Sequence, residues 1–351
     1  MAKLASRGVS EYCQTMSYLL AAALVFGACL GPTAAVAAPG PSAPPPSGRQ
    51  PELTVDSLSV VRLRTRVVSN ARSAETLGTE REGTGVVIDA NGLVLTIGYL
   101  ILEAETIELS TADGRSFPAA AVAYDAVTGF GLVRAFGQLP IKPATIGESS
   151  KVAMREPVFI VGFDGVAPGY VVSRRRFVGF WEYLLEDAIF TAPATVNWQG
   201  AALLDREQRL LGIGSLAVPD SIGDGSSIAG HMFVPIDRLK PVLADLLARG
   251  RAAGPARPWL GVSTQEVEGN VIVTRVANGS PAAQAPIRVG DVIVALGGQT
   301  LKGQADFYTR LWASGAAGRE IALDVLRNGR IERVTAKSID RDAYYRPKPT
   351  Y

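Results

Sequence analysis

Residues 84–97, TGVVIDANGLVLTI, decide the fold class of this chain. Two apolar runs, GVVI and LVLTI, flank the residues DANG at positions 89–92. The Asn91-Gly92 pair can take the positive φ angles that a tight chain reversal requires. The stretch therefore predicts a β-hairpin.

Further short runs with β-strand character follow the hairpin, with glycines between them. They lie at residues 119–123, 157–161, 170–178 and 210–215. Regularly spaced short strands with turn signals are typical of an all-β barrel or sandwich. We therefore expect a β-rich domain in this part of the chain.

The first clear helical pattern comes after Pro235. Apolar residues recur there at helical spacing, at Leu239, Val242, Leu243, Leu246 and Leu247. Gly250 can supply a left-handed stop. This helix is expected to close a first domain at residues 53–250, and residues 251–258, RAAGPARP, read as a linker.

A second, compact domain of about 80 residues is expected at residues 259–338, mixing strands with one or two helices. Residues 271–276 and 291–296 have the pattern of strands, and Phe307 with Leu311 marks one face of a short helix. Residues 321–336 alternate around Asn328-Gly329 as a second hairpin. Residues 339–351 are left as a C-terminal tail.

The N-terminal residues 1–37 fit a secretory signal peptide. An apolar run at residues 18–30 follows two basic residues, and the small residues 35–37 fit a cleavage site. Export to the periplasm or cell envelope is therefore expected. Residues 38–52 are rich in proline and predict an extended linker.

Two alternatives for this segment stay open. Cys29 could be acylated as in a lipoprotein, which would tether the chain to a membrane, or the segment could remain as an uncleaved anchor. Both cysteines, Cys13 and Cys29, lie in the segment, so cleavage after Ala37 would leave no thiol. We then expect no disulfide framework, no cysteine metal site and no cofactor.

The charge balance argues against nucleic acid as a partner. Lys+Arg number 35 and Asp+Glu number 33, which gives a net charge of +2 over 351 residues. No bulk field therefore favours nucleic acid or an acidic substrate. The basic run at residues 174–176 is expected to be a solvated face rather than an anion site.

Several stretches, in order, resemble the landmarks of the HtrA family (also called the Deg family) of exported trypsin-like serine proteases with a C-terminal PDZ domain. They are the hairpin at 83–96, YDAVTGFGLV at 124–133, VFIVGFDG at 158–165, residues 231–250, WLGV at 259–262 and residues 279–298. The resemblance extends from about residue 60 to 336. It implies a mostly β protein, a chymotrypsin-like double six-stranded β-barrel followed by a PDZ domain.

The chain departs from that family at the catalytic positions. In residues 191–205, TAPATVNWQGAALLD, Gln199 stands where the family has its nucleophilic serine. The same alignment puts Tyr99 at the catalytic histidine and Gly129 at the catalytic aspartate. All three positions of the triad are then degenerate.

The chemistry of acyl transfer requires the groups that are missing. It needs an activated hydroxyl, a base that carries its proton, and a carboxylate that orients the base. A glutamine amide is not a useful nucleophile, and a tyrosine with a pKa of about 10 is a poor proton acceptor near pH 7. Loss of a whole triad costs on the order of a million-fold in turnover.

Other groups near these positions leave some alternatives open. His231, the single histidine of the chain, is expected to be structural rather than a relocated base. Ser149, Ser150 and Lys151 are adjacent in sequence, and surface-loop composition explains them better than a serine-lysine dyad. Trp198 fits a plug of the cleft and an ordinary core aromatic equally well.

The PDZ signature implies a peptide site. Such domains bind an extended C-terminal peptide as an added strand and receive its carboxylate on backbone N–H groups. The resemblance places this loop at Trp259, Leu260, Gly261 and Val262, with the last three residues offering the amides. Pro286 replaces a glycine usual in the family, so the adjoining turn is expected to differ.

Three functions follow from these observations. The first is a catalytically inactive pseudoprotease that acts as an exported scaffold or regulator and binds C-terminal or extended peptides of envelope or secreted proteins; by family resemblance it would be a homo-oligomer, a trimer. The second is an active HtrA-like endopeptidase with a displaced centre, involved in envelope protein quality control. The third is a membrane-tethered assembly factor, with Cys29 acylated. No metal site is expected in any of them.

Overall fold

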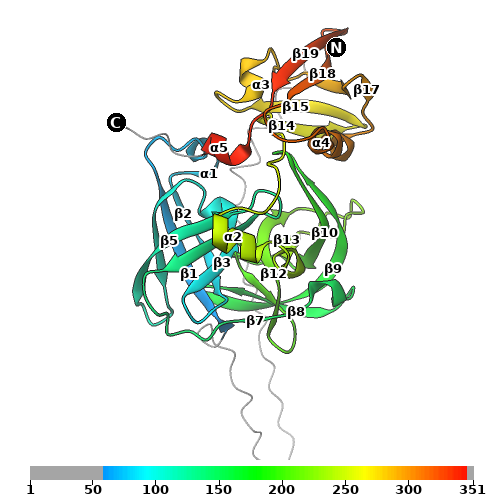
Figure 1. Ribbon diagram of the computed structural model, residues 1–351. Helices are drawn as coiled ribbons and strands as arrows, with labels where there is room; N and C mark the ends of the chain where they lie inside the picture. Colours follow the sequence, from blue (N-terminus) through cyan, green and yellow to red (C-terminus); the bar gives the residue numbers. More distant parts are fainter. Residues whose placement is uncertain (1–57, 346–351) are drawn as a thin grey trace, which may run out of the picture. The chain divides into compact units, whose positions relative to one another are not determined.

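The computed structural model of the chain describes residues 58–345 (Figure 1). The expected signal segment, with Cys13 and Cys29, and the proline-rich linker lie outside the described residues, as does the end of the C-terminal tail. Within residues 58–345 no helix has the length and apolar character needed to cross a membrane.

The first six strands form a closed antiparallel barrel in the order β1-β2-β3-β6-β5-β4. Its strands are β1 (Val60–Val67), β2 (Glu80–Val87), β3 (Leu93–Ile97), β4 (Ala104–Ser110), β5 (Ser116–Tyr124) and β6 (Phe130–Ala135). The short helices α1 (Ala74–Leu77) and η2 (Gly98–Leu100) follow β1 and β3. The barrel confirms the expected β-rich architecture.

The predicted hairpin at residues 84–97 is the β2–β3 pair. Val86 pairs with Leu95, and Val87 pairs with Val94. The Asp89 carboxylate accepts hydrogen bonds from the N–H groups of Asn91 and Leu93, each at 2.8 Å, and so holds the turn. The turn is therefore stabilised by hydrogen bonds among its own residues. The predicted hairpin is confirmed.

A second ring of six strands closes because β11 pairs with both β8 and β12. The ring comprises β8 (Pro157–Gly162), β9 (Gly165–Gly179), β10 (Tyr183–Ala192), β11 (Ala202–Leu204), β12 (Arg209–Val218) and β13 (Gly230–Pro235). The two-residue strand β7 (Thr145–Ile146) adds to β12 in parallel, and η3 (Ser149–Lys151) follows it. The double barrel is thus present, with one short strand beyond the expected six.

One apolar cluster fills the first barrel and continues into the second. Leu63, Leu95 and Phe130 of the first barrel belong to it, together with Phe190 and Met232 of the second, and all five are fully buried. The loops that connect the strands at the barrel junction are therefore held against a continuous core.

The helix predicted after Pro235 is shorter than its pattern. It consists of η4 (Ile236–Arg238) and α2 (Leu243–Arg249), and Gly250 ends α2 in the left-handed conformation at φ +70°. Leu246 is buried, but Leu247 is 40% exposed. Two of the five apolar residues predicted to share one helical face, Leu239 and Val242, precede α2, which has only seven residues. The apolar face of α2 is therefore smaller than the sequence pattern predicts.

The C-terminal domain has a sheet in the order β14-β15-β16-β18-β19, with β17 paired to β16. Its elements are β14 (Val262–Val267), β15 (Asn270–Val276), α3 (Pro281–Gln284), β16 (Val292–Leu296), β17 (Gln299–Thr300), α4 (Gln304–Ala313), β18 (Glu320–Arg327), β19 (Arg330–Lys337) and α5 (Arg341–Tyr345). Phe307 and Leu311 of α4 are fully buried, as predicted. The second predicted hairpin is β18–β19, where Arg327 pairs with Arg330.

Candidate functional site

Tyr99 lies in η2, directly after β3, and its side chain is partly buried against the barrel core. Its hydroxyl donates a hydrogen bond of 2.9 Å to the carbonyl oxygen of Ser215 in β12. Burial raises the pKa of Tyr99 further above its usual value of 10. The hydroxyl is therefore a fixed donor and cannot take up a proton at neutral pH.

Gly129 lies in the turn between β5 and β6, beside the residue that precedes Tyr99. Its carbonyl oxygen accepts a hydrogen bond of 2.7 Å from the N–H of Gly98. Its φ is +88°, and a Cβ there would lie 3.2 Å from the hydroxyl oxygen of Tyr183. The backbone at this position therefore favours glycine over a residue with a side chain.

The carboxylate of Asp125, four residues before Gly129, is already engaged. It accepts hydrogen bonds from the N–H of Thr128 at 3.1 Å and from the Thr128 hydroxyl at 2.6 Å. Asp125 is only 5% exposed. Its carboxylate holds the β5–β6 turn and is not presented to a base.

Gln199 lies in the loop that joins β10 to β11, at the junction of the two barrels. Its carbonyl oxygen accepts a hydrogen bond of 2.8 Å from the N–H of Thr84 in β2. The next residue, Gly200, has φ +74°, and a Cβ there would overlap the carbonyl oxygen of Thr84. Its N–H donates to the carbonyl of Gly214, which precedes Ser215. The structure thus brings the loop of Gln199 and the hydroxyl of Tyr99 to the same stretch of β12.

Trp198 packs against His231, with ring centroids 5.8 Å apart and nearly parallel planes. His231 of β13 is fully buried, and its Nε2 accepts a hydrogen bond of 2.6 Å from the N–H of Thr195. The Thr195 hydroxyl oxygen lies 3.1 Å from the same nitrogen. Spacing in the sequence did not predict this pair, because 36 residues separate its members.

The electrostatics of His231 favour a neutral ring. Burial lowers its pKa below the usual 6.5. Because Nε2 accepts a backbone N–H, the ring proton belongs on Nδ1. Nδ1 is buried without a hydrogen-bond partner in the described part of the chain. No carboxylate therefore orients this ring.

The serine-lysine alternative receives no geometric support. The Ser149 hydroxyl accepts a hydrogen bond of 3.0 Å from the N–H of Asp237, and the Asp237 carboxylate accepts the N–H of Ser150. Lys151 instead pairs with Glu148 at 2.8 Å. These groups hold η3 against η4 and do not form a catalytic pair.

The basic run is not a free anion site either. Arg174 donates to the carbonyl oxygens of Ser150 and Val152, and Arg176 pairs with Glu186. Arg175 lies over the ring of Phe190 and donates to three carbonyl oxygens of the loop that follows β12. The run therefore fixes loops.

The second site is the loop at Trp259, Leu260, Gly261 and Val262. Trp259 pairs with Ile339 through backbone hydrogen bonds, and its ring packs on Tyr344. Gly261 has φ +81°, and a Cβ there would overlap the side chain of Ser280. The loop is therefore closely packed from behind and presents its backbone on the other side.

The N–H groups of Leu260, Gly261 and Val262 converge on the carboxylate of Glu182, at 3.1, 2.7 and 3.0 Å. Glu182 belongs to the turn between β9 and β10, and it is 5% exposed. Burial raises its pKa to about 7, and the three N–H groups and Arg341 partly offset this effect. Such a convergence of backbone N–H groups is the arrangement that binds anions in proteins.

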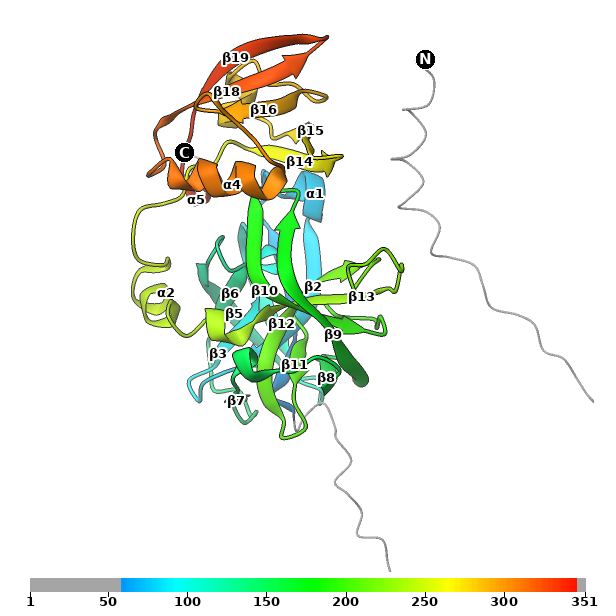
Figure 2. The same cartoon turned by 90° about the vertical axis from the view of Figure 1, so that its right-hand side faces the viewer.

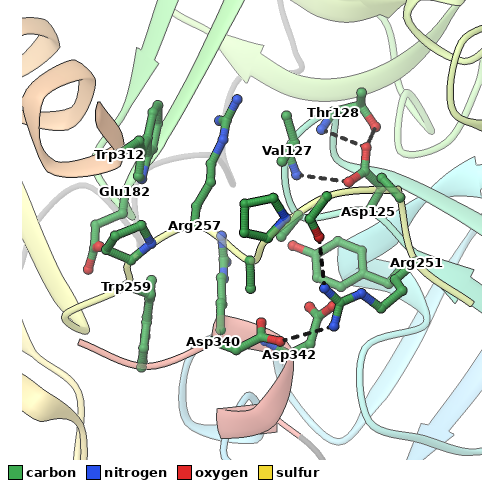
Figure 3. Close-up of a pocket in the computed structure, with 18 of the residues that line it drawn as sticks. Asp125, Val127, Thr128, Glu182, Arg251, Arg257, Trp259, Trp312, Asp340 and Asp342 are labelled. Atoms are coloured by element: carbon green, nitrogen blue, oxygen red, sulfur yellow. Dashed lines mark hydrogen bonds and ion pairs between the residues drawn. The ribbon is translucent and has the colours of Figure 1, made fainter. Parts of the chain in front are cut away.

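A cavity of about 340 Å³ lies beside Glu182 (Figure 3). Its walls combine aromatic rings with charged side chains of both signs, among them Trp312, Arg257, Asp340 and Asp342. Arg257 lies over the ring of Trp312 at 4.5 Å from its centroid. The opposing charges largely balance, so this cavity has no strong preference for a cation or an anion.

Two family models match the chain. "Trypsin-like peptidase domain" matches residues 83–213, and "PDZ domain" matches residues 258–337. The chain is of the HtrA type. The double barrel that contains Tyr99, Gly129 and Gln199 is thus a trypsin-like domain, and the loop at 259–262 belongs to a PDZ domain.

Curated relatives of this HtrA-type chain are named as proteases. "Serine protease Do-like HtrA" of Bacillus subtilis is 24% identical over 71% of this chain and 61% of the relative. "Probable periplasmic serine endoprotease DegP-like" of Pseudomonas putida is 28% identical over 71% of this chain and 53% of the relative. "Periplasmic pH-dependent serine endoprotease DegQ" of Escherichia coli is 27% identical over 71% and 57%. The chain spans 53 to 61% of the length of these relatives.

Solved structures share the fold. "HtrA-type protease AlgW with decapeptide" is 22% identical and covers 84% of this chain and 98% of its own, with a TM-score of 0.50. A variant of the same protease with a tripeptide gives a TM-score of 0.51 at 23% identity, over 82% of this chain and 95% of that one. At this identity the likeness establishes the fold alone.

Proposed function

We propose that this HtrA-type chain is a catalytically inactive pseudoprotease that binds extended or C-terminal peptides through its PDZ domain, as an exported scaffold or regulator. The observation that carries the proposal is the set of groups at the barrel junction. Gln199 supplies only an amide, and the hydroxyl of Tyr99 is a proton donor. Gly129 has no side chain. None of them can act as nucleophile, base or orienting acid.

The fixed geometry of these groups supports the same conclusion. Tyr99 is committed to the carbonyl of Ser215, and Asp125 is committed to Thr128. A bound substrate would therefore find neither a proton acceptor at Tyr99 nor a free carboxylate at Asp125. Catalysis would be limited to what binding and backbone N–H groups contribute.

The second candidate function is an endopeptidase with a displaced centre, and the Thr195–His231 pair is the observation that favours it. A hydroxyl 3.1 Å from an imidazole nitrogen resembles a nucleophile and its base. However, the same nitrogen already accepts the N–H of Thr195 at 2.6 Å, and burial makes the ring a weaker base. The pair is therefore better suited to holding the loop of Gln199 in place.

A fluorophosphonate probe distinguishes the two functions, because it labels an activated hydroxyl covalently. We expect no labelling of the purified chain and no cleavage of casein. Covalent labelling of a serine or of Thr195 would overturn the proposal. Thr195→Ala is the matched variant, since it should abolish labelling at that site and leave any adventitious labelling unchanged.

The PDZ domain is proposed to bind peptides through its loop at residues 259–262. Three N–H groups converge there on a carboxylate, which is the chemistry that a free chain end presents. AlgW, a structural neighbour, was solved with a decapeptide. Fluorescence anisotropy with a mixed library of labelled short peptides that end in a free carboxylate tests this function. The same library with amidated ends is the control, and equal binding of both would contradict it.

Export and assembly are proposed on family resemblance. Residues 1–37 would be removed as a signal, or Cys29 would be acylated, and intact-mass spectrometry of the native protein separates these outcomes. A trimer would be seen by light scattering after size-exclusion chromatography. A monomer at all concentrations would contradict that part of the proposal.

A further inference from the structure

The turn that joins β9 to β10 lies between β14 and α4 of the PDZ domain and is hydrogen-bonded to both. The space between these two elements is called the PDZ groove below. The carbonyl oxygen of Phe180 accepts a hydrogen bond of 2.8 Å from the N–H of Thr264 in β14. β14 is an edge strand whose other side pairs with β15, so this bond is made on its free edge. Figure 2 shows the ends of β9 and β10 reaching β14 and α4. Backbone pairing on this edge is how an extended peptide is bound.

The carboxylate of Glu182 completes the likeness to a bound peptide. Its oxygens accept the N–H groups of Leu260, Gly261 and Val262, so all three donors of the loop are in use. A side-chain carboxylate thus stands where a chain end would lie. An incoming C-terminal carboxylate finds no free donor among these three residues.

The opposite wall of the groove also contacts the turn. The fully buried hydroxyl of Tyr308 in α4 donates a hydrogen bond of 3.0 Å to the carbonyl of Gly179. The same oxygen accepts the N–H of Glu182 at 3.2 Å. These bonds involve the backbone of the turn. Both walls of the groove therefore hold the segment between Gly179 and Glu182.

The backbone of Glu182 shows that local turn preferences do not explain this residue. Glu182 has φ +53°, at the third position of a three-residue hairpin loop, where glycine is favoured. A glutamate there costs conformational free energy, which the hydrogen bonds to residues 260–262 offset. Asp187 in β10 has a similar φ of +56° but is solvated beside Arg238. It provides a matched control.

We propose that residues 179–183 are an internal ligand of the PDZ groove, and that a partner protein with a free, extended C-terminus binds by displacing them. The proposal rests on the proposed function of this domain as a peptide binder. The partner must supply its own carboxylate, because the three loop amides would otherwise lose their acceptor. Only molecules with an open groove can bind the partner. The apparent affinity for the partner is therefore the intrinsic affinity multiplied by the open fraction.

Hydrogen exchange measured by mass spectrometry on the full chain tests the internal ligand without any peptide. Glu182→Gly removes the carboxylate and relieves the backbone strain, so it separates release of the groove from loss of folding. We expect exchange at the amides of residues 260–262 to accelerate roughly tenfold or more. Asp187→Gly should leave these amides unchanged. Equal exchange in Glu182→Gly and the unaltered chain would overturn the internal ligand.

The carboxylate-ended peptide library then tests displacement. We expect Glu182→Gly to bind it roughly tenfold or more tightly than the unaltered chain, and the amidated library to bind neither protein. Equal, carboxylate-dependent binding by both proteins would overturn displacement while supporting peptide binding. If exchange accelerates in Glu182→Gly but neither protein binds the library, the internal ligand stands, and displacement fails together with the proposed function.

Discussion

Opening of the PDZ groove is expected to depend on pH through Glu182. Burial raises the pKa of Glu182 to about 7 in the docked turn, against the usual 4.5 of a solvated glutamate, which the released turn approaches. The docked state therefore binds more protons between these values, and its advantage is lost as the pH rises through 7. From pH 5 to pH 8 the open fraction should increase by roughly 70-fold, or about 2.5 kcal/mol.

The groups that face Glu182 set the size of this effect. Arg341 of α5 attracts the carboxylate, and the Tyr308 hydroxyl of α4 contacts the neighbouring backbone. Arg257 and Asp342 line the adjoining cavity, and burial raises the pKa of Asp342 as well. Glu182→Gln keeps the shape of the side chain and removes its titration, so it isolates the contribution of this residue.

Hydrogen exchange at residues 260–262, corrected for intrinsic rates at each pH, measures this opening. The amide of Val273, which donates to the carbonyl of Asp291 in the PDZ core, reports opening of the domain as a whole. We expect protection at residues 260–262 to fall from pH 5 to pH 8 while protection at Val273 is retained. Protection that is constant with pH, or that falls equally in Glu182→Gln, would show that titration of Glu182 does not control the opening.

Three further results are expected. A triple variant that restores the triad, with Tyr99→His, Gly129→Asp and Gln199→Ser, should still not be labelled by fluorophosphonate. Residue 129 has φ +88°, and its Cβ would lie 3.2 Å from the buried hydroxyl of Tyr183, so an aspartate there would be strained. Labelling of the triple variant would contradict this. Arg81→Met should destabilise the chain by about 3 kcal/mol in urea denaturation, since the 6% exposed guanidinium donates to three backbone carbonyls and a serine hydroxyl. Asp291→Asn should lower the free energy of unfolding by about 2 kcal/mol at pH 7 and by less at acidic pH. Burial alone would raise the pKa of this carboxyl, but the hydrogen bonds from Arg327 and from the N–H of Arg288 outweigh burial and lower it. A loss of stability that does not depend on pH would contradict this.

The sequence predicted those parts of the fold that local signals specify. The hairpins around Asn91-Gly92 and Asn328-Gly329 depend on residues that tolerate positive φ, and both are present. The face of α4 marked by Phe307 and Leu311 follows from helical spacing. These features depend only on residues that are close together in the sequence, so the sequence alone predicts them.

Contacts between distant segments were not accessible in this way. Thr195 meets His231 across 36 residues, and Glu182 meets Leu260 across 78. A glutamate does not indicate a positive φ, and a glutamate in a turn is usually exposed to solvent. The sequence therefore contained no sign that Glu182 is buried. The positions of Tyr99, Gly129 and Gln199 came from family resemblance, whereas the roles of their hydrogen bonds required the structure.

Strand β10 connects the two sites and limits how they can influence each other. It begins at Tyr183, beside Glu182, and ends at Ala192, where the loop of Gln199 starts. β9 pairs with it along its length, but β13 pairs only with Ile189–Thr191. The half of β10 near the PDZ groove is thus one arm of a two-stranded ribbon (Figure 1). Tyr183 and Leu185 at its start are nevertheless buried in the barrel core, and the Tyr183 hydroxyl donates a hydrogen bond of 2.7 Å to the carbonyl of Thr128. The half near Gln199 is held between two neighbouring strands and by the bonds of Thr195 to His231. Displacement of the turn should therefore act first on Tyr183, whose hydroxyl contacts the β5–β6 turn beside Gly129, and leave the loop of Gln199 unchanged.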